Sequence, residues 1–373
     1  MQLIIKTTLK TIRPIIYLLL LLHGGSAIGQ DTTYTPGRWS FSFQAHTGFL
    51  MAHRPTIMYL QDEKAYAYEF SILKSRTGEA DWHSRYNFPL VGFSYRYSNF
   101  GNSKRIGNAH AIYPQLLFPL LRQQRLRMGV RFGFGFGYVE KPFDVLVNYK
   151  NLAIGSHLNA SVLLGLQFRA LIRQRVQIST GIDFYHLSNG AASIPNLGIN
   201  FPSVYLGINY FSGTATNSTY TTHEKPKRKT EITVYYAAGI KEKYPPAGPK
   251  YLVNVLNGQI HTTSGTKGLL GGGIEYMLDE SLPAKLEDDG IQTTFVEGAT
   301  RLGLFGSAGL RMGKWDGHFQ TGFYLYNRYK PDGDLYSRIA IRHHFNQHLF
   351  ATLNLKTHYA KADYAEWGIG YRF

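Results

Sequence analysis

One short segment of the sequence, 183–200, holds residue types that could carry out nucleophilic chemistry. His186 and Ser188 lie two residues apart within it. On a β-strand, residues two apart share a face, so the imidazole could take the hydroxyl proton as the oxygen attacks an electrophilic carbon. A His and a Ser at the rim of a barrel are also often plain interfacial residues, and spacing alone does not separate the two interpretations.

The predicted strand that carries this pair has one apolar face, and the pair lies on it. Ile178, Ile182 and Phe184 precede His186 at even spacings, whereas Asp183 lies on the opposite face. In a membrane barrel the apolar face is directed at lipid. The pair is therefore expected to point outward at the external end of its strand, where unpartnered polar groups are unfavourable. An outward Ser–His pair at that depth is well placed to meet a lipid ester.

Strict alternation of apolar and polar residues, the period of a β-strand, dominates the rest of the sequence. It is clear in 158–168, 232–238 and 349–358. Many such segments run about 10 to 12 residues, the length that a tilted strand needs to cross a bilayer, whereas strands of soluble proteins are typically about five or six residues long. The predicted fold class is an all-β, antiparallel transmembrane β-barrel.

About sixteen strands can be counted, and an even number places both termini on the periplasmic side. The polar segment 213–229 is the only plausible domain boundary. We favour one barrel of about sixteen strands, because the last strand can then close on the first; two tandem 8-stranded barrels are the alternative. The expected strands lie near 39–50, 64–75, 89–99, 107–119, 126–138, 157–169, 176–188, 202–212, 231–241, 250–262, 268–278, 300–311, 317–326, 336–344, 348–358 and 363–373.

The two ends of the chain carry signals of export to the outer membrane. Basic residues precede the apolar run 15–22 and small residues follow it, which is the order of a secretory signal peptide. The run is too short to span a bilayer, and cleavage is expected near Gly29. The last strand alternates up to Phe373, a pattern that resembles the terminal strand recognised during outer-membrane assembly. The predicted divisions are a signal peptide (1–29), a first barrel half (30–212), a polar junction (213–229) and a second barrel half (230–373).

The composition excludes several kinds of site. The chain has no cysteine, which rules out disulfides, cysteine–zinc sites and a lipid-anchored cysteine. The formal net charge is +16 at pH 7, which suits an anionic partner. Because the chain is predicted to be exported and has no recognition motif for nucleic acid, we expect anionic lipid and no nucleic acid as its partner.

Further residues around the His–Ser pair match a known pattern. They are His186-Leu-Ser188-Asn189 and Pro195-Asn196-Leu-Gly198-Ile199, with Trp82, Tyr86, Pro89, Gly92, Phe100-Gly101, Gly107, Ala109 and Tyr113-Pro114 upstream. Together they resemble the outer-membrane lipid A 3-O-deacylase family over about 64–212, and 230–373 is not explained by it. The resemblance implies an eight-stranded barrel that hydrolyses an ester-linked acyl chain of lipid A with a Ser–His–Glu arrangement.

The resemblance also implies roles by position. Ser188 would be the nucleophile, and His186 would take its proton and later return it to the leaving sugar hydroxyl. The loop after the strand would supply the oxyanion and substrate-binding donors. These loop residues are Asn189, Gly190, Ala191 and Asn196.

The sequence departs from the family at the position of the acid, which is Asn200. A carboxylate stabilises the imidazolium that forms, whereas an amide can only orient the ring through its carbonyl oxygen. In serine proteases the Asp-to-Asn exchange lowers kcat about ten-thousand-fold through the wrong tautomer, yet Cys–His–Asn sites function. Asp183 cannot easily substitute for the acid, because it is predicted to face the lumen.

The leading hypothesis is an esterase in the outer membrane of a Gram-negative bacterium that acts on lipid A in lipopolysaccharide and needs no metal or cofactor. The competing hypothesis is a non-enzymatic barrel, either a porin-like channel or a lipopolysaccharide-binding structural protein. A wide barrel would favour the channel, because eight-stranded barrels are filled by side chains. A deacylase-like half fused to a second half of separate purpose is a third possibility. The sequence gives no sign of an oligomeric state.

Overall fold

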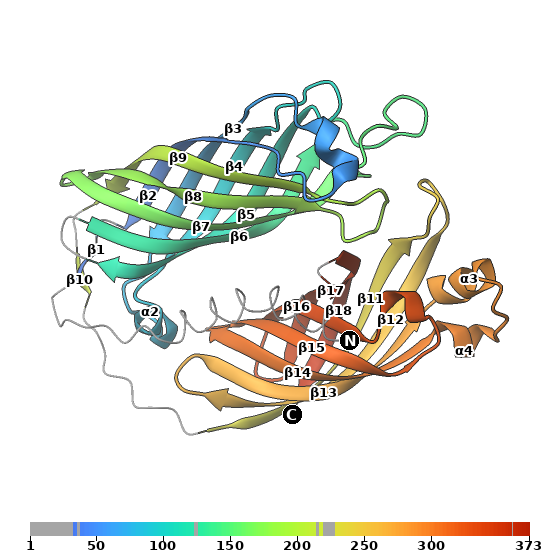
Figure 1. Ribbon diagram of the computed structural model, residues 1–373. Coiled ribbons are helices and arrows are strands. Elements are labelled where there is room, and N and C mark those ends of the chain that lie inside the picture. Colours follow the sequence, from blue (N-terminus) through green and yellow to red (C-terminus); the bar gives the residue numbers. More distant parts are fainter. Residues whose placement is uncertain (1–32, 36–37, 123–125, 214–215, 219–227, 360) are drawn as a thin grey trace, which may run out of the picture. The chain divides into compact units, whose positions relative to one another are not determined.

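The computed structural model describes residues 33–35, 38–122, 126–213, 216–218, 228–359 and 361–373. They form two closed antiparallel barrels of eight strands each, drawn in Figure 1. None of the described helices has the length and hydropathy that a membrane-spanning helix needs. The expected signal peptide, 1–29, lies outside the described residues.

The first barrel closes by pairing its first strand with its eighth. Its strands are β2 (Trp39–Gly48), β3 (Ala65–Ser75), β4 (Leu90–Asn99), β5 (Asn108–Arg122), β6 (Leu126–Val139), β7 (Leu158–Arg173), β8 (Val176–Ser188) and β9 (Ile199–Ser212). The short strands β1 (Thr33–Thr35) and β10 (Thr216–Ser218) pair with each other outside it.

The second barrel closes in the same way, between β11 and β18. Its strands are β11 (Thr230–Glu242), β12 (Lys250–Ser264), β13 (Gly268–Asp279), β14 (Thr300–Met312), β15 (Trp315–Asn327), β16 (Leu335–His344), β17 (Leu349–His358) and β18 (Lys361–Arg372).

The preference for a single barrel of sixteen strands is wrong, and the alternative of two tandem 8-stranded barrels is correct. The register decides this, because β2 is hydrogen-bonded to β9 from Trp39↔Ser212 to Gly48↔Ser203. Alternation specifies which face of a strand is buried but not which strand is its neighbour. The sixteen barrel strands agree with the expected segments to within a few residues, and β9 begins three residues before the expected 202.

Short helices occupy the long connections, and the sequence pattern did not indicate them. In the first barrel they are η1 (Pro55–Leu60) and α2 (Asp81–Arg85). In the second barrel they are α3 (Ser281–Asp288), α4 (Phe295–Ala299) and η2 (Lys330–Asp332).

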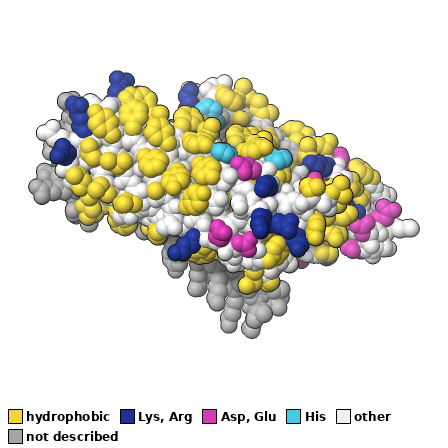
Figure 2. All heavy atoms as spheres, turned by 90° about the horizontal axis from the view of Figure 1, so that it is seen from above, with side chains coloured by type: hydrophobic (Ala, Val, Ile, Leu, Met, Phe, Trp, Pro, Cys, Tyr) yellow, Lys and Arg dark blue, Asp and Glu magenta, His cyan; other side chains and the backbone are white. Residues whose placement is uncertain are grey.

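Apolar side chains cover the outside of the strands. On β9 the outward residues Val204, Leu206 and Ile208 are 54%, 64% and 53% exposed. Hydrophobic side chains spread over much of the face seen in Figure 2, and charged side chains are confined to a few groups. Such an apolar exterior is stable only against lipid.

The interior of each barrel is filled with paired charges. In the first, Arg131 contacts both Glu69 and Asp183, and its Nη1 lies 2.8 Å from Asp183 Oδ2. In the second, Arg338 contacts Glu275 and lies 3.0 Å from Glu366. These arginines and both glutamates of the second barrel are fully buried. Eight-stranded barrels are wide enough for side chains to fill and not for a water channel.

The connections at one end of the first barrel pack together as a cap. Asn148 and Asn151 hold the 140–157 connection by donating to the carbonyl of Arg105 at 2.8 and 3.2 Å. Glu140 accepts the backbone N–H of Asn108 at 2.8 Å, and this hydrogen bond lowers the pKa of the carboxyl. The apolar residues of the cap are Leu50, Ile57, Leu60, Phe100, Ile106, Val139, Ala153 and Ile154.

Candidate functional site

The pairing of β8 with β9 brings His186 directly opposite Asn200. Directly opposed residues of antiparallel strands have Cβ atoms about 4.5–5.5 Å apart on the same face, which is within reach of an imidazole and an amide. His186 Nδ1 lies 2.7 Å from Asn200 Oδ1. Since an amide oxygen can only accept, Nδ1 carries the proton and donates it. The other ring nitrogen, Nε2, keeps a lone pair that can act as a base.

The site is covered although it lies on the lipid-facing side. His186 and Ser188 share the outward face of β8 with Ile182 and Phe184, as the alternation predicted. Yet Ser188 is 8% exposed and Asn200 is 7% exposed, against more than half for the outward residues of β9 farther along. The connection 189–198 begins and ends at the site, and Gly198 lies against the imidazole of His186.

Gly198 brings the covering connection against the imidazole. A Cβ atom at this position would lie 2.6 Å from His186 Cε1, and the backbone has a positive φ of +84°. Only glycine adopts such a conformation without strain and leaves room for the ring. The Gly198 N–H donates to the carbonyl of Ala153 at 2.8 Å, which fixes the connection to the cap.

Ser188 Oγ has no hydrogen-bond partner within the described part of the chain, and the network that reaches His186 does not extend to it. Two residues on one strand face are about 6.6 Å apart at Cα, so a rotation of the side chains is needed to join them. Contacts between a nucleophile and its base are often long in the absence of substrate and tighten when it binds.

Hydrogen-bond donors lie in the connection that follows Ser188. The Asn189 N–H donates to Asn196 Oδ1 at 3.1 Å, and Asn189 Nδ2 donates to Ser156 Oγ at 2.8 Å. The donors of Asn189 are thus already used in fixing the loop. Asn196 Nδ2 is buried and has no partner among the described residues. The hydrogen bond that Asn196 Oδ1 accepts from the Asn189 N–H orients this free donor.

Gly190 and Ala191 follow with positive φ angles of 63° and 65°. Two such residues in succession turn the chain sharply after the strand, and for Ala191 this backbone is strained. Strained loop backbone is frequent at functional sites.

A residue that the sequence did not indicate completes the site. His53 lies in the connection between β2 and η1, and its Nδ1 is 2.8 Å from Asn200 Nδ2. The Met51 N–H also donates to the Asn200 carbonyl at 2.8 Å, so this connection is tied to β9 by both backbone and side chain. Asn200 is therefore held between two imidazoles. Asp183, as expected, points into the lumen and pairs with Arg131.

Two groups of described residues have the donor atoms of a metal site, but neither fits one. His46, Glu69 and Asp183 lie among Arg96 and Arg131.

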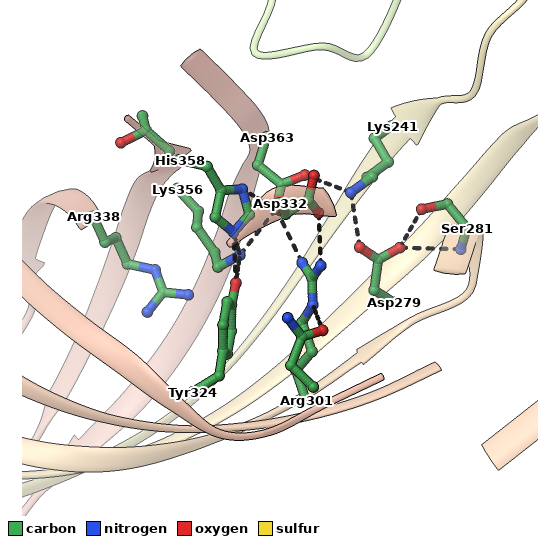
Figure 3. Close-up of polar contacts among 12 residues, drawn as sticks. Lys241, Asp279, Ser281, Arg301, Tyr324, Asp332, Arg338, Lys356, His358 and Asp363 are labelled. Carbon is green, nitrogen blue, oxygen red and sulfur yellow. Dashed lines mark hydrogen bonds and ion pairs between the residues drawn. The ribbon is translucent and has the colours of Figure 1, made fainter. Parts of the chain in front are cut away.

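In the second barrel Asp332, His358 and Asp363 form the other group. Figure 3 shows Lys241, Arg301 and Lys356 directed at its carboxylates, and Lys356 Nζ is 2.9 Å from Asp363 Oδ2. The carboxylates are already neutralised by cationic side chains, which would repel a metal ion.

Two family models match the chain. One, described as lipid A 3-O-deacylase (PagL), matches 67–209, and the other, described as acyloxyacyl hydrolase, C-terminal domain, matches 230–373. The first match includes β8, Asn200 and most of β9. The second covers the half that the sequence resemblance did not explain. The search of curated proteins found no match.

Solved structures similar to the chain are outer-membrane barrels. A triple-mutant porin of Rhodopseudomonas blastica is 9% identical with a TM-score of 0.19, and covers 90% of this chain and 99% of its own. The Acinetobacter baumannii outer membrane protein Omp33 is 7% identical with a TM-score of 0.16, and covers 92% and 99%. At such scores these likenesses carry no argument about the site.

Proposed function

We propose that this chain, which belongs to the lipid A 3-O-deacylase family, is an outer-membrane esterase that removes an ester-linked acyl chain from lipid A by a Ser188–His186 mechanism. Asn200 takes the position of the family's acid. The observation that carries the proposal is the 2.7 Å hydrogen bond from His186 Nδ1 to Asn200 Oδ1 on the lipid-facing side of the strand that ends with Ser188.

In the acylation step, His186 Nε2 takes the Ser188 proton as Oγ attacks the carbonyl carbon of the acyl ester. The negative charge that develops on the carbonyl oxygen needs donors. The free Asn196 Nδ2 is the best-supported donor, together with the backbone N–H groups of Gly190 and Ala191. The intermediate collapses when His186 returns the proton to the leaving sugar oxygen, which leaves an acyl–Ser188 ester and a free sugar hydroxyl.

In the deacylation step, His186 takes a proton from water, and the hydroxide equivalent attacks the acyl–Ser188 carbonyl. Collapse returns the proton to Ser188 Oγ and releases the fatty acid. Asn200 holds the ring in the Nδ1–H tautomer throughout, which leaves Nε2 free for proton transfer. Because an amide carries no charge, it stabilises the imidazolium less than a carboxylate would.

A porin-like channel is disfavoured by the filled lumens, in which Arg131 and Arg338 are fully buried. The test uses purified protein refolded into phospholipid bilayers that contain lipid A. We expect release of one fatty acid per lipid A and no steady conductance when the same protein is inserted in a planar bilayer. Conductance without fatty-acid release would contradict the proposal and favour the channel. The absence of both conductance and fatty-acid release would favour a structural barrel.

Replacing Asn200 with glutamate is expected to raise the rate of fatty-acid release by at least about tenfold. A carboxylate restores charge stabilisation of the imidazolium and always accepts from Nδ1, and in serine proteases this difference is worth about ten-thousand-fold in kcat. The rate on lipid A is compared for wild type, Asn200→Glu and Asn200→Ala. A glutamate variant that is folded but no faster than wild type would show that the amide does not limit the reaction.

Replacing Gly198 with alanine is expected to lower the rate about a hundredfold, because a displacement of a catalytic group by about 1 Å costs that much. The added Cβ would push against His186 Cε1. Gly290→Ala is the matched control: its φ is +74°, so it suffers similar backbone strain, but its Cβ meets nothing within 4 Å. Equal rates for the two variants would show that the contact between Gly198 and the imidazole does not affect the reaction.

A further inference from the structure

The amide of Asn200 lies between two imidazoles, and its orientation determines which ring faces its oxygen and which ring faces its nitrogen. Its Oδ1 accepts from His186 Nδ1 at 2.7 Å, and its Nδ2 donates to His53 Nδ1 at 2.8 Å. His53 is an exposed residue on the connection after β2, outside the strands. The Met51 N–H, two residues earlier, holds that connection on the Asn200 carbonyl.

A chain of two neutral imidazoles and one amide has two self-consistent hydrogen-bond arrangements. In the first, which the structure adopts, His53 Nδ1 accepts from the amide and His186 Nδ1 donates to it. In the second the amide is turned over, so that His53 Nδ1 donates to Oδ1 and Nδ2 donates to His186 Nδ1. The second arrangement puts the His186 proton on Nε2, where it blocks the base. A carboxylate at position 200 would have no such ambiguity, because it accepts from both rings.

We propose that His53 is a positioning residue: by accepting from Asn200 Nδ2, it keeps Oδ1 on His186 and so keeps His186 in the tautomer whose Nε2 can act as a base. This inference rests on the proposed function for its kinetic consequence, but the tautomer itself can be observed without it. His53 compensates for the ambiguity that arises where an amide replaces the acid.

The test exchanges the hydrogen-bonding character of residue 53. His53→Asp supplies an oxygen at the same number of bonds from Cα as Nδ1, and this oxygen only accepts. His53→Lys supplies only donors. With Asn200 present, the aspartate variant should stay within about threefold of wild type, and the lysine variant should lose at least about tenfold by forcing the wrong tautomer. His53→Ala should fall between them.

The same two variants are then made together with Asn200→Glu, and there the order should invert. A lysine at position 53 donates to the carboxylate introduced at position 200 and is tolerated, whereas an aspartate beside that carboxylate is repelled. A side chain that merely stabilises the loop would give the same loss in both backgrounds. Equal effects of each residue 53 variant in the two backgrounds would overturn the proposal.

The second readout is the nitrogen NMR spectrum of histidine-labelled protein in lipid nanodiscs, with the His186 signals identified by their loss in His186→Gln. Wild type and His53→Asp should show His186 protonated at Nδ1, and His53→Lys should show it protonated at Nε2. If the tautomer follows residue 53 but no lipid A is cleaved, the positioning role stands and the proposed function fails. If lipid A is cleaved and the tautomer ignores residue 53, the positioning role fails alone.

Discussion

Replacing Ser188 with alanine is expected to lower the rate of fatty-acid release by about ten-thousand-fold or more, because loss of the nucleophile in serine hydrolases costs up to about 10⁶ in kcat. The outward barrel surface and the lumen pairs do not involve this hydroxyl, which has no partner among the described residues. The fold should therefore be retained. Rates are measured on lipid A in bilayers, with folding followed by the heat-dependent shift in gel mobility.

Two further variants, a control and a double variant, test this interpretation of Ser188→Ala. Ser103→Ala removes an exposed hydroxyl from the 100–107 connection of the same barrel and should leave the rate unchanged. The double variant Ser188→Ala with His186→Ala should be no slower than Ser188→Ala, because residues that act as one unit are strongly non-additive. If Ser188→Ala kept more than a tenth of the wild-type rate, another group would have to be the nucleophile.

Replacing Arg131 with methionine is expected to destabilise the first barrel by about 3–5 kcal/mol, the cost of leaving a buried charge without its partner. Arg131 contacts Glu69 and lies 2.8 Å from Asp183, and these side chains are shielded from solvent. The second barrel has its own pairs around Arg338 and should be unaffected. The free energy of unfolding is measured by urea titration in lipid vesicles, with separate tryptophan probes in the two barrels.

The matched control for this variant is Arg175→Met, which changes an exposed arginine in the turn between β7 and β8 and should shift stability by less than about 0.5 kcal/mol. Adding Asp183→Asn to Arg131→Met should restore part of the loss, because the remaining buried carboxylate of Glu69 is still paired with Arg96 at 3.3 Å. An unaltered unfolding midpoint for Arg131→Met alone would mean that the lumen is hydrated and the pair is screened.

The faces and lengths of the strands could be predicted from the sequence because alternation is a local property. The outward direction of His186 and Ser188 and the inward direction of Asp183 followed from it and agree with the burial of their neighbours. The closure of the barrel could not be predicted in this way. Each strand satisfies its faces equally well beside any other strand of the same pattern, so β9 gave no local sign that it pairs with β2.

The incorrect prediction of a single barrel is also the reason why the sequence did not indicate His53 as a site residue. In a single barrel of sixteen strands, the connection after the first strand would lie beside the last strand, far from Asn200. With β2 paired to β9, the same connection reaches Asn200, and His53 contacts its amide. The ion pairs inside the lumen could not be predicted for a related reason. Alternation places Glu69 and Arg131 inside, but their pairing depends on how the eight strands close into a barrel.

Both halves of the chain now match family descriptions, which was not expected of residues 230–373. The two halves differ in their chemistry. His358, near the end of β17, points into the lumen and contacts Tyr324 at 2.7 Å, whereas His186 faces outward beside Ser188. The proposed chemistry uses residues of the first barrel.

Deacylation of lipid A by Ser188 is tested by mass spectrometry of lipid A from Gram-negative cells that express either the wild-type chain or Ser188→Ala at matched levels in the outer membrane. We expect that lipid A from wild-type cells is lighter by one ester-linked acyl chain and that lipid A from Ser188→Ala cells is unchanged. Unchanged lipid A in both, with folded protein present, or the same loss in both, would contradict it.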